Sequence, residues 1–230
     1  MIVTAPKEPN GKLMSLKTVS VAEAATSRLR ETLFSGEFAA GEEIKDTHIA
    51  TLYGIARPTA RIAVQQLINE GMLVRKTGHS ARVRTFYPEE VRDLYRVRKL
   101  IELDSIREIK KHQKPLNLVT DSLEAFHAIP RGREEWASLA AADAAFHSSV
   151  VNSASSPRLQ TYFSGISSEI RLVIALLKAQ YLNDASLYKE HAALYRILSD
   201  DTASLEELEQ AWTEHLDSAQ NFLEQHLASP

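Results

Sequence analysis

The sequence predicts a mainly α-helical protein in two parts, a small helical domain that ends in a β-hairpin and an all-α antiparallel bundle of about six helices. The chain has 230 residues, of which 44% are hydrophobic, so it can bury a sizeable core. Six of the eight glycines lie before residue 80, and turns are therefore expected mainly in the first part. From Pro88 onward the apolar residues recur with a helical period, and strand signals are absent.

The two parts also differ in charge. The whole chain has 27 Lys and Arg against 30 Asp and Glu, which excludes a polycationic coat for nucleic acid. Residues 1–87 contain 12 basic and 8 acidic residues, a net charge of +4, which leaves 15 basic and 22 acidic residues, a net charge of −7, for the remainder. This asymmetry favours a polyanionic partner for the first part, with a chance difference as the alternative.

The chain has no cysteine, which excludes disulfide scaffolds, thiolate metal sites and thiol catalysis. Any metal site must therefore use His, Asp or Glu. Residues 1–19 mix lysine and proline without the apolar core of a signal peptide, and we expect them to form a flexible N-terminus. No stretch approaches the roughly 18 apolar residues of a membrane span, so we expect a cytoplasmic protein with no membrane partner.

Residues 20–87 are predicted to form three helices followed by two strands. The apolar periods and turn residues place helices at 21–35, 46–54 and 57–70, and strands at 72–76 and 81–86. Asp46 is the expected N-cap of the second helix. Gly36, Gly54 and Gly71 each follow a helix at the position that favours a left-handed residue. Three helices and a hairpin in this order predict a winged helix-turn-helix.

The third helix of this domain has one basic, amide-bearing face. Arg57, Arg61 and Gln65 follow each other at intervals of four residues, and Val64 lies on the opposite side. Arginine can bond guanine edges, and Thr59 or Gln65 can bond bases or phosphates. The hairpin adds five basic residues suited to phosphate contact, namely Arg75, Lys76, His79, Arg82 and Arg84. The alternative is a solvated helix whose arginines only add solubility.

The second and third helices are joined by Leu52-Tyr53-Gly54-Ile55-Ala56-Arg57-Pro58-Thr59-Ala60-Arg61, and Glu70-Gly71-Met72-Leu73 precedes the wing. With these residues the first domain resembles the N-terminal domain of GntR-type bacterial transcriptional regulators. It implies that Arg57 and Arg61 contact operator DNA, supported by Thr47 and Gly78. Two positions depart from the family pattern, which usually has Ser or Thr in place of Ala56 and Glu in place of Ile62.

Residues 88–230 are predicted to form the helical bundle. Its six helices are expected at 89–111, 116–128, 133–153, 157–179, 185–199 and 204–227. Prolines at 88, 115, 130 and 157 mark boundaries between them.

Polar residues interrupt the inward faces of three bundle helices. Asp143 and His147 lie four residues apart on the stripe Trp136, Ala140, Val150, Ala154. His191 lies on the stripe Leu187, Leu194, Leu198, and His215 on the stripe Leu205, Leu208, Trp212, Ala219, Phe222. Burying these four groups unpaired would be costly, and a shared divalent cation would satisfy them all. The alternative is that each histidine bonds locally. His226 shares the stripe of the last helix but is not assigned to the site.

The second part resembles the C-terminal helical domain of the FadR-like branch of the same regulators, an FCD-type effector and metal-binding domain. The resemblance rests on Val91 to Glu102, Asp143-Ala144-Ala145-Phe146-His147, Glu190-His191 and Glu214-His215-Leu216. It implies that Asp143, His147, His191 and His215 are the metal ligands. It also implies that Arg98 faces the cavity as the partner of an effector carboxylate, with Arg171 as a second candidate.

Together these features predict a homodimeric transcriptional regulator that binds double-stranded operator DNA. We expect a repressor that senses a small organic acid at a divalent metal site, and the residues do not rank zinc, nickel and manganese. Two alternatives stay open, a metal that only supports the bundle and a metal-dependent hydrolase. The sequence disfavours an enzyme because no inward Glu or Lys is found beside the four ligands to act as a general base.

Overall fold

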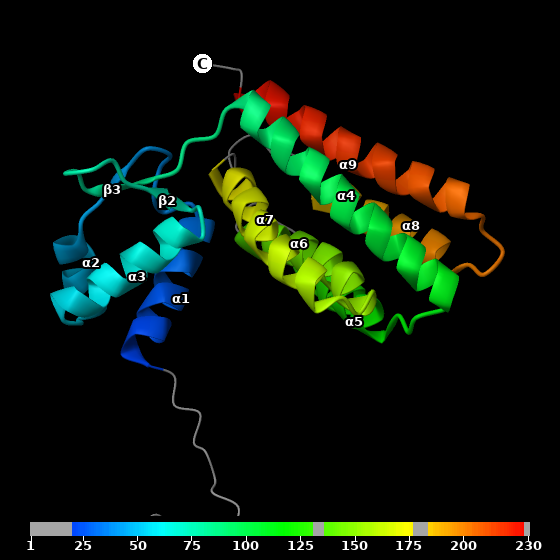
Figure 1. Cartoon of the computed structure of the whole chain (residues 1–230), viewed down its shortest axis with the longest axis horizontal. Coiled ribbons are helices and arrows are strands. Elements are labelled where there is room, and N and C mark those ends of the chain that lie inside the picture. Colours follow the sequence, from blue (N-terminus) through cyan, green and yellow to red (C-terminus); the bar gives the residue numbers. More distant parts are fainter. Residues whose placement is uncertain (1–19, 131–135, 177–183, 228–230) are drawn as a thin grey trace, which may run out of the picture.

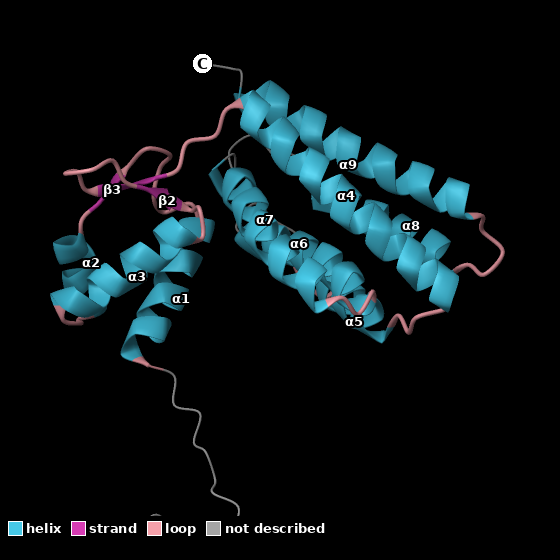
Figure 2. Cartoon of the chain, viewed as in Figure 1, coloured by secondary structure: helices cyan, strands magenta, loops and turns pink. Residues whose placement is uncertain are grey.

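The computed structural model describes residues 20–130, 136–176 and 184–227 (Figure 1). Its first part combines helices with a small sheet, and from Pro88 onward all the described elements are helices (Figure 2). The flexible segment expected for residues 1–19 lies outside the described residues. Among the described helices, none has the length and hydropathy that crossing a bilayer would require.

The first domain contains α1 (Val21–Phe34), β1 (Glu43–Ile44), α2 (Asp46–Tyr53), α3 (Arg57–Asn69), β2 (Leu73–Val74) and β3 (Ala81–Val83). A capping box opens α1, because the Glu23 amide donates to Ser20 Oγ and the Ser20 amide donates to the Glu23 carboxylate. Gly54 ends α2 with a φ of 63°, a left-handed conformation that glycine adopts without strain. The three predicted helices and the wing are therefore confirmed.

Two details of this domain differ from the prediction. Lys45, not Asp46, occupies the N-cap of α2, and Asp46 lies in the first turn with its carboxylate 3.8 Å from Arg75. The sheet has three antiparallel strands in the order β1-β3-β2, where a two-stranded hairpin was expected. With only two residues, β1 is too short to produce an alternating pattern in the sequence.

The second domain contains α4 (Pro88–His112), α5 (Asn117–His127), α6 (Trp136–Ser153), α7 (Pro157–Leu176), α8 (Asp184–Ser199) and α9 (Leu205–Leu227). These six described helices confirm the predicted antiparallel bundle. Helix α4 packs along α9, α6 lies between α5 and α7, and α8 contacts both α5 and α9 (Figure 1).

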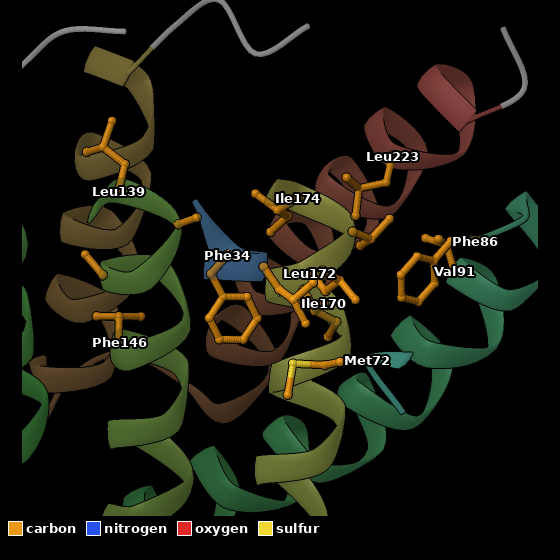
Figure 3. Packing of buried hydrophobic residues seen from close by; sticks show 14 of the residues in the cluster. Phe34, Met72, Phe86, Val91, Leu139, Phe146, Ile170, Leu172, Ile174 and Leu223 are labelled. Atoms are coloured by element: carbon orange, nitrogen blue, oxygen red, sulfur yellow. The ribbon is translucent and has the colours of Figure 1, made fainter. Parts of the chain in front are cut away.

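The two domains share one hydrophobic core. Phe34 of α1 and Met72 of the first domain lie close to Ile170 and Leu172 of α7 (Figure 3). The cluster continues from there into both domains, so α7 is the helix of the bundle that receives the first domain.

Candidate metal centre and nucleic-acid interface

Three histidines from three different helices meet inside the bundle. His147 of α6 and His191 of α8 are fully buried, and His215 of α9 is half-buried. The Nε2 atom of His147 lies 3.1 Å from Nε2 of His191 and 3.3 Å from Nε2 of His215. One ring nitrogen of each histidine could therefore ligate a common ion, because these three atoms all lie within 4.8 Å of one another.

The inward stripes predicted from the sequence explain this convergence. The apolar residues that accompany His147 on α6 and His191 on α8 are all buried. On α9 the stripe is buried at Leu208 and Trp212, but Leu205 is 41% exposed, so the prediction was wrong at that residue. Leu205 is the first residue of α9, and the buried residues of this helix begin one turn later, at Leu208.

Hydrogen bonds at the far side of two rings fix their tautomers. The Nδ1 atom of His191 lies 2.7 Å from the carbonyl oxygen of Leu187, which can only accept, so Nδ1 carries the proton. The Nδ1 atom of His147 lies 2.7 Å from Glu102 Oε2. Burial opposes ionisation of Glu102, but the charge of Arg98 and the hydrogen bonds from His147 and Arg98 hold its pKa well below the usual range. The carboxylate therefore accepts a hydrogen bond from His147, whose Nδ1 carries the proton.

In its neutral form, a ring whose Nδ1 carries the proton has its lone pair on Nε2. Burial, reinforced by the positive charge of Arg98, lowers the pKa of His147 to about 4, so this ring is neutral at pH 7. Two neutral rings of this tautomer cannot bond each other through nitrogens 3.1 Å apart, and a cation between the nitrogens removes the conflict. Two nitrogens at 2.0–2.1 Å from one Zn²⁺ ion would be separated by about 2.9–3.4 Å. The distances between the histidines fit that requirement.

A carboxylate lies beside two of these rings. Asp143 Oδ1 lies 3.1 Å from Nε2 of His191 and 3.9 Å from Nε2 of His147. Burial opposes the ionisation of Asp143, but its pKa lies below the usual range, in part because of the positive charge of Arg98. The structure thus brings three of the four proposed ligands to one point and places the fourth, Asp143, beside two of them.

Glu102 is the residue of this site that sequence reasoning missed. Its fully buried carboxylate accepts from Arg98 Nε at 2.6 Å, from His147 Nδ1 at 2.7 Å and from Trp212 Nε1 at 2.7 Å. The expectation that no inward Glu lies beside the ligands was therefore wrong. Three donors occupy its two oxygens, so it orients His147 and is poorly placed to act as a general base.

The signal for Glu102 is present in the sequence of α4. Arg98 and Glu102 are four residues apart and lie on the same stripe as the buried Val91, Tyr95 and Ile109. An acidic and a basic residue in the middle of an apolar stripe indicate a buried pair. Such a pair requires further hydrogen bonds, which here come from α6 and α9.

Arg98 lies beside the histidine cluster with part of its guanidinium unused. Nε donates to Glu102 and Nη1 donates to the Tyr95 hydroxyl at 3.2 Å, whereas Nη2 donates to no side chain or carbonyl of the described residues. Burial opposes the charge of Arg98, but the Glu102 carboxylate keeps its pKa above the usual value. Burial raises the pKa of Tyr95 to about 12, so its hydroxyl keeps its proton.

Arg171 is placed elsewhere. It lies on α7 against the first domain, with its guanidinium carbon 3.9 Å from the centre of the Phe34 ring and Nη2 3.1 Å from Glu31 Oε2. The structure does not bring this arginine to the histidines. The face of α7 that packs on α1 is fixed by the contact between the domains, which the periodicity of α7 alone does not reveal.

Four of the residues proposed for DNA contact line one hollow of about 510 Å³ at the surface of the first domain. These are Thr47 of α2, Arg57 and Arg61 of α3 and Gly78 of the wing. All four are exposed. Basic side chains thus surround a surface hollow that could receive an anion.

The other two proposed residues lie outside the lining of this hollow. Gln65 is exposed and accepts from Arg75 at 3.3 Å, which places it at the edge, whereas Thr59 is half-buried. One basic residue of the wing that was expected to suit phosphate contact is bonded elsewhere. Arg84 pairs with Glu169 of α7 and with Glu90 of α4, so it joins the domains instead of facing solvent.

Two family descriptions match the sequence. The description "Bacterial regulatory proteins, gntR family" matches residues 21–83, and "FCD domain" matches residues 93–218. An uncharacterised HTH-type transcriptional regulator of Bacillus subtilis, YdhC, is 24% identical over 112 residues. That match covers 47% of this chain and spans only half the length of the relative.

Solved structures share the fold. A GntR-type regulator described as putative, from Rhodococcus sp. RHA1, has a TM-score of 0.78 at 21% identity, covering 91% of this chain and 99% of its own. McbR/YncC of E. coli has a TM-score of 0.73 at 16% identity, covering 90% and 99% of the two chains. At these identities the similarity establishes the shared fold.

The role of Glu102 in the bundle can be tested by removing its charge. We expect Glu102→Gln to lower the free energy of unfolding by about 3–5 kcal/mol, because Arg98 would remain buried without the carboxylate that bonds it directly. Urea denaturation in the presence of a chelator measures this effect without a contribution from bound metal. The matched control is Glu108→Gln on the same helix, whose carboxylate is 44% exposed. An effect no larger than that of the control would contradict this role.

Proposed function

Because the chain belongs to the GntR family of bacterial regulatory proteins and carries an FCD domain, we propose that it is a homodimeric repressor controlled by a small organic acid. Residues 20–87 bind double-stranded operator DNA, and residues 88–230 bind the effector, a divalent metal ion and the second subunit. The observation that best supports the sensing half is the pair of buried imidazole nitrogens that face each other at 3.1 Å.

His147, His191, His215 and Asp143 would hold the metal ion. Three imidazole nitrogens and one carboxylate oxygen suit zinc, nickel or manganese. When bound, the ion would neutralise the facing lone pairs and offer open positions to an oxygen donor. Glu102 and the carbonyl of Leu187 hold two of the rings in the tautomer that ligation requires.

The charge of the site favours an anionic effector. Arg98 and Glu102 cancel each other, and a divalent ion beside Asp143 would leave one positive charge inside the bundle, since ligating imidazoles are neutral. The remaining carboxylate beside the rings, Glu190, lies 3.6 Å from His215 Nδ1 and is 51% exposed, so solvent screens it. A carboxylate supplies the missing negative charge. The unused Nη2 of Arg98 and the hydroxyl of Tyr95 are the donors that can meet it.

Helix α4 offers a route from this site to the DNA-binding surface. Arg98 lies on α4, and two turns earlier the same helix carries Glu90, which accepts from Arg84 at the end of the wing at 3.1 Å. A shift of α4 on effector binding would therefore move a residue bonded to the wing. Coupling of this kind is commonly about 1–3 kcal/mol.

Dimerisation is required by the small size of one DNA-reading domain. A single winged helix makes few phosphate contacts and binds weakly, whereas two related domains read a two-fold symmetric operator. The bundle also exposes apolar side chains, with Leu100 of α4 and Tyr162 of α7 each 66% exposed. These residues could pack against a second copy.

DNA binding should depend on Arg61. We expect Arg61→Ala to weaken binding to a selected operator by about 1–3 kcal/mol, because a guanidinium that bonds a base edge or phosphate is lost. Fluorescence anisotropy at fixed salt measures the affinity. Arg96→Ala, at an exposed position of α4, serves as the control and should leave it unchanged. If Arg61→Ala reduced metal content as much as affinity, the assignment of the two domains would be wrong.

Metal binding should depend on His191. Purified protein is expected to hold about one divalent ion per chain, lost in His191→Ala and on acidification, because only neutral imidazole ligates. Elemental analysis after gel filtration measures the content. His226→Ala is the matched control, since His226 Nδ1 bonds the Phe222 carbonyl at 2.7 Å on the same helix as His215. If protein prepared with an excess of divalent metal held none after gel filtration, the site would be ruled out.

Effector binding can be measured by calorimetry. Metal-loaded protein is titrated with dicarboxylates and sugar acids, and we expect saturable heat for at least one acid that is lost in Arg98→Gln. Heat from none of the acids would favour a metal that only supports the bundle. Turnover of an added acid or ester would favour the hydrolase.

A further inference from the structure

The DNA-reading helix exposes an isoleucine that the protein core does not use. Ile62 follows Arg61 on α3 and is 57% exposed. The buried residues of α3 are Ala60, Ala63, Val64 and Leu67, all 0% exposed. At about 100° per residue, Ile62 projects roughly 150° away from the middle of that buried face. It packs in neither of the hydrophobic clusters formed by the described residues.

The neighbours of Ile62 on this face leave it accessible. Pro58, four residues earlier, is exposed, and the two glutamines that follow have amide groups bonded along the helix. Gln65 donates to Asn69 at 3.1 Å, and Gln66 donates to Glu70 at 3.0 Å. Pro58 and Ile62 therefore form a small apolar strip, while the amides beside it are already partly satisfied.

The charge around this strip identifies its occupant. Arg57 and Arg61 flank it on the same helix and line the basic hollow with Arg75 and Lys45. A surface so rich in positive charge is suited to a polyanion rather than to an apolar protein face. In the major groove of duplex DNA, the apolar group offered by the bases is the C5-methyl group of thymine.

We propose that Ile62, together with Pro58, packs against the C5-methyl group of a thymine next to the base or phosphate contacted by Arg61. The chain would then select thymine at that operator position. The inference rests on the DNA-binding half of the proposed function and adds a residue that determines base specificity.

The test removes the methyl group from the DNA and the isoleucine from the protein, separately and together. The probe is the duplex that wild-type protein enriches most from a random pool, with each thymine of one half-site replaced in turn by deoxyuridine. We expect one replacement to weaken wild-type binding about fourfold, which corresponds to ~0.8 kcal/mol for one buried methyl group. Ile62→Ala should bind both forms of that duplex equally, and Ile62→Val should keep most of the preference.

A matched variant tests whether any exposed apolar residue gives this result. Leu52 of α2 is 51% exposed and lines a different hollow, with Val21 and Arg28 of α1. Leu52→Ala should therefore keep the fourfold preference for thymine over deoxyuridine. Thermal melting checks that each variant is folded, since exposed substitutions rarely change stability by more than about 0.5 kcal/mol.

Three results would overturn the inference. Wild-type binding could be insensitive to every deoxyuridine replacement, or Ile62→Ala could keep the wild-type preference. A change in oligomeric state caused by Ile62→Ala would assign the strip to a second copy of the chain. Enrichment of no duplex by the wild-type protein would overturn the DNA-binding proposal itself, a result distinct from the first two.

Discussion

The carboxylate of Glu102 is the point on which the helical domain depends. Its two oxygens bond side chains from α4, α6 and α9, so one ionised group joins three helices in the middle of an apolar core. Burying that charge is costly unless every lone pair is used and a counter-charge lies close, and Arg98 provides the latter. The same bonds determine which nitrogen of His147 remains free. Helix packing and the chemistry of the histidine cluster therefore have a common origin.

Much of the fold could be predicted because helical periodicity, helix caps and the glycines that end helices are local properties of the sequence. Most ends of the predicted helices agree with the described ones to within a few residues. His147, His191 and His215, which the inward stripes predicted to face the bundle core, lie together. Asp46 was misassigned as a cap because a side chain that could cap can equally pair with a wing arginine. The strand β1 was missed because two residues show no period.

The candidate site was less predictable wherever its geometry depends on packing between distant elements. The Arg98 and Glu102 pair lies within an apolar stripe of α4, which indicates that it is buried, but its further hydrogen-bond partners come from α6 and α9 and cannot be found from α4 alone. Arg84 was expected to suit phosphate contact and Arg171 was the second candidate for an effector carboxylate, yet both lie at the contact between the domains. A basic residue near a domain boundary can serve either role, and its own sequence neighbourhood does not distinguish them.

The hydrophobic core shared by the two domains has a consequence for how this chain can evolve. Phe34 and Met72 pack with residues of α7, and Figure 3 shows this contact beside Phe86 and Val91 at the connection. Splitting the chain at residue 88 would expose apolar area on both halves. An N-terminal domain taken from another regulator would need a surface that matches α7 as well as a compatible linker. Such recombination is therefore constrained by the shape of the contact between α7 and the first domain.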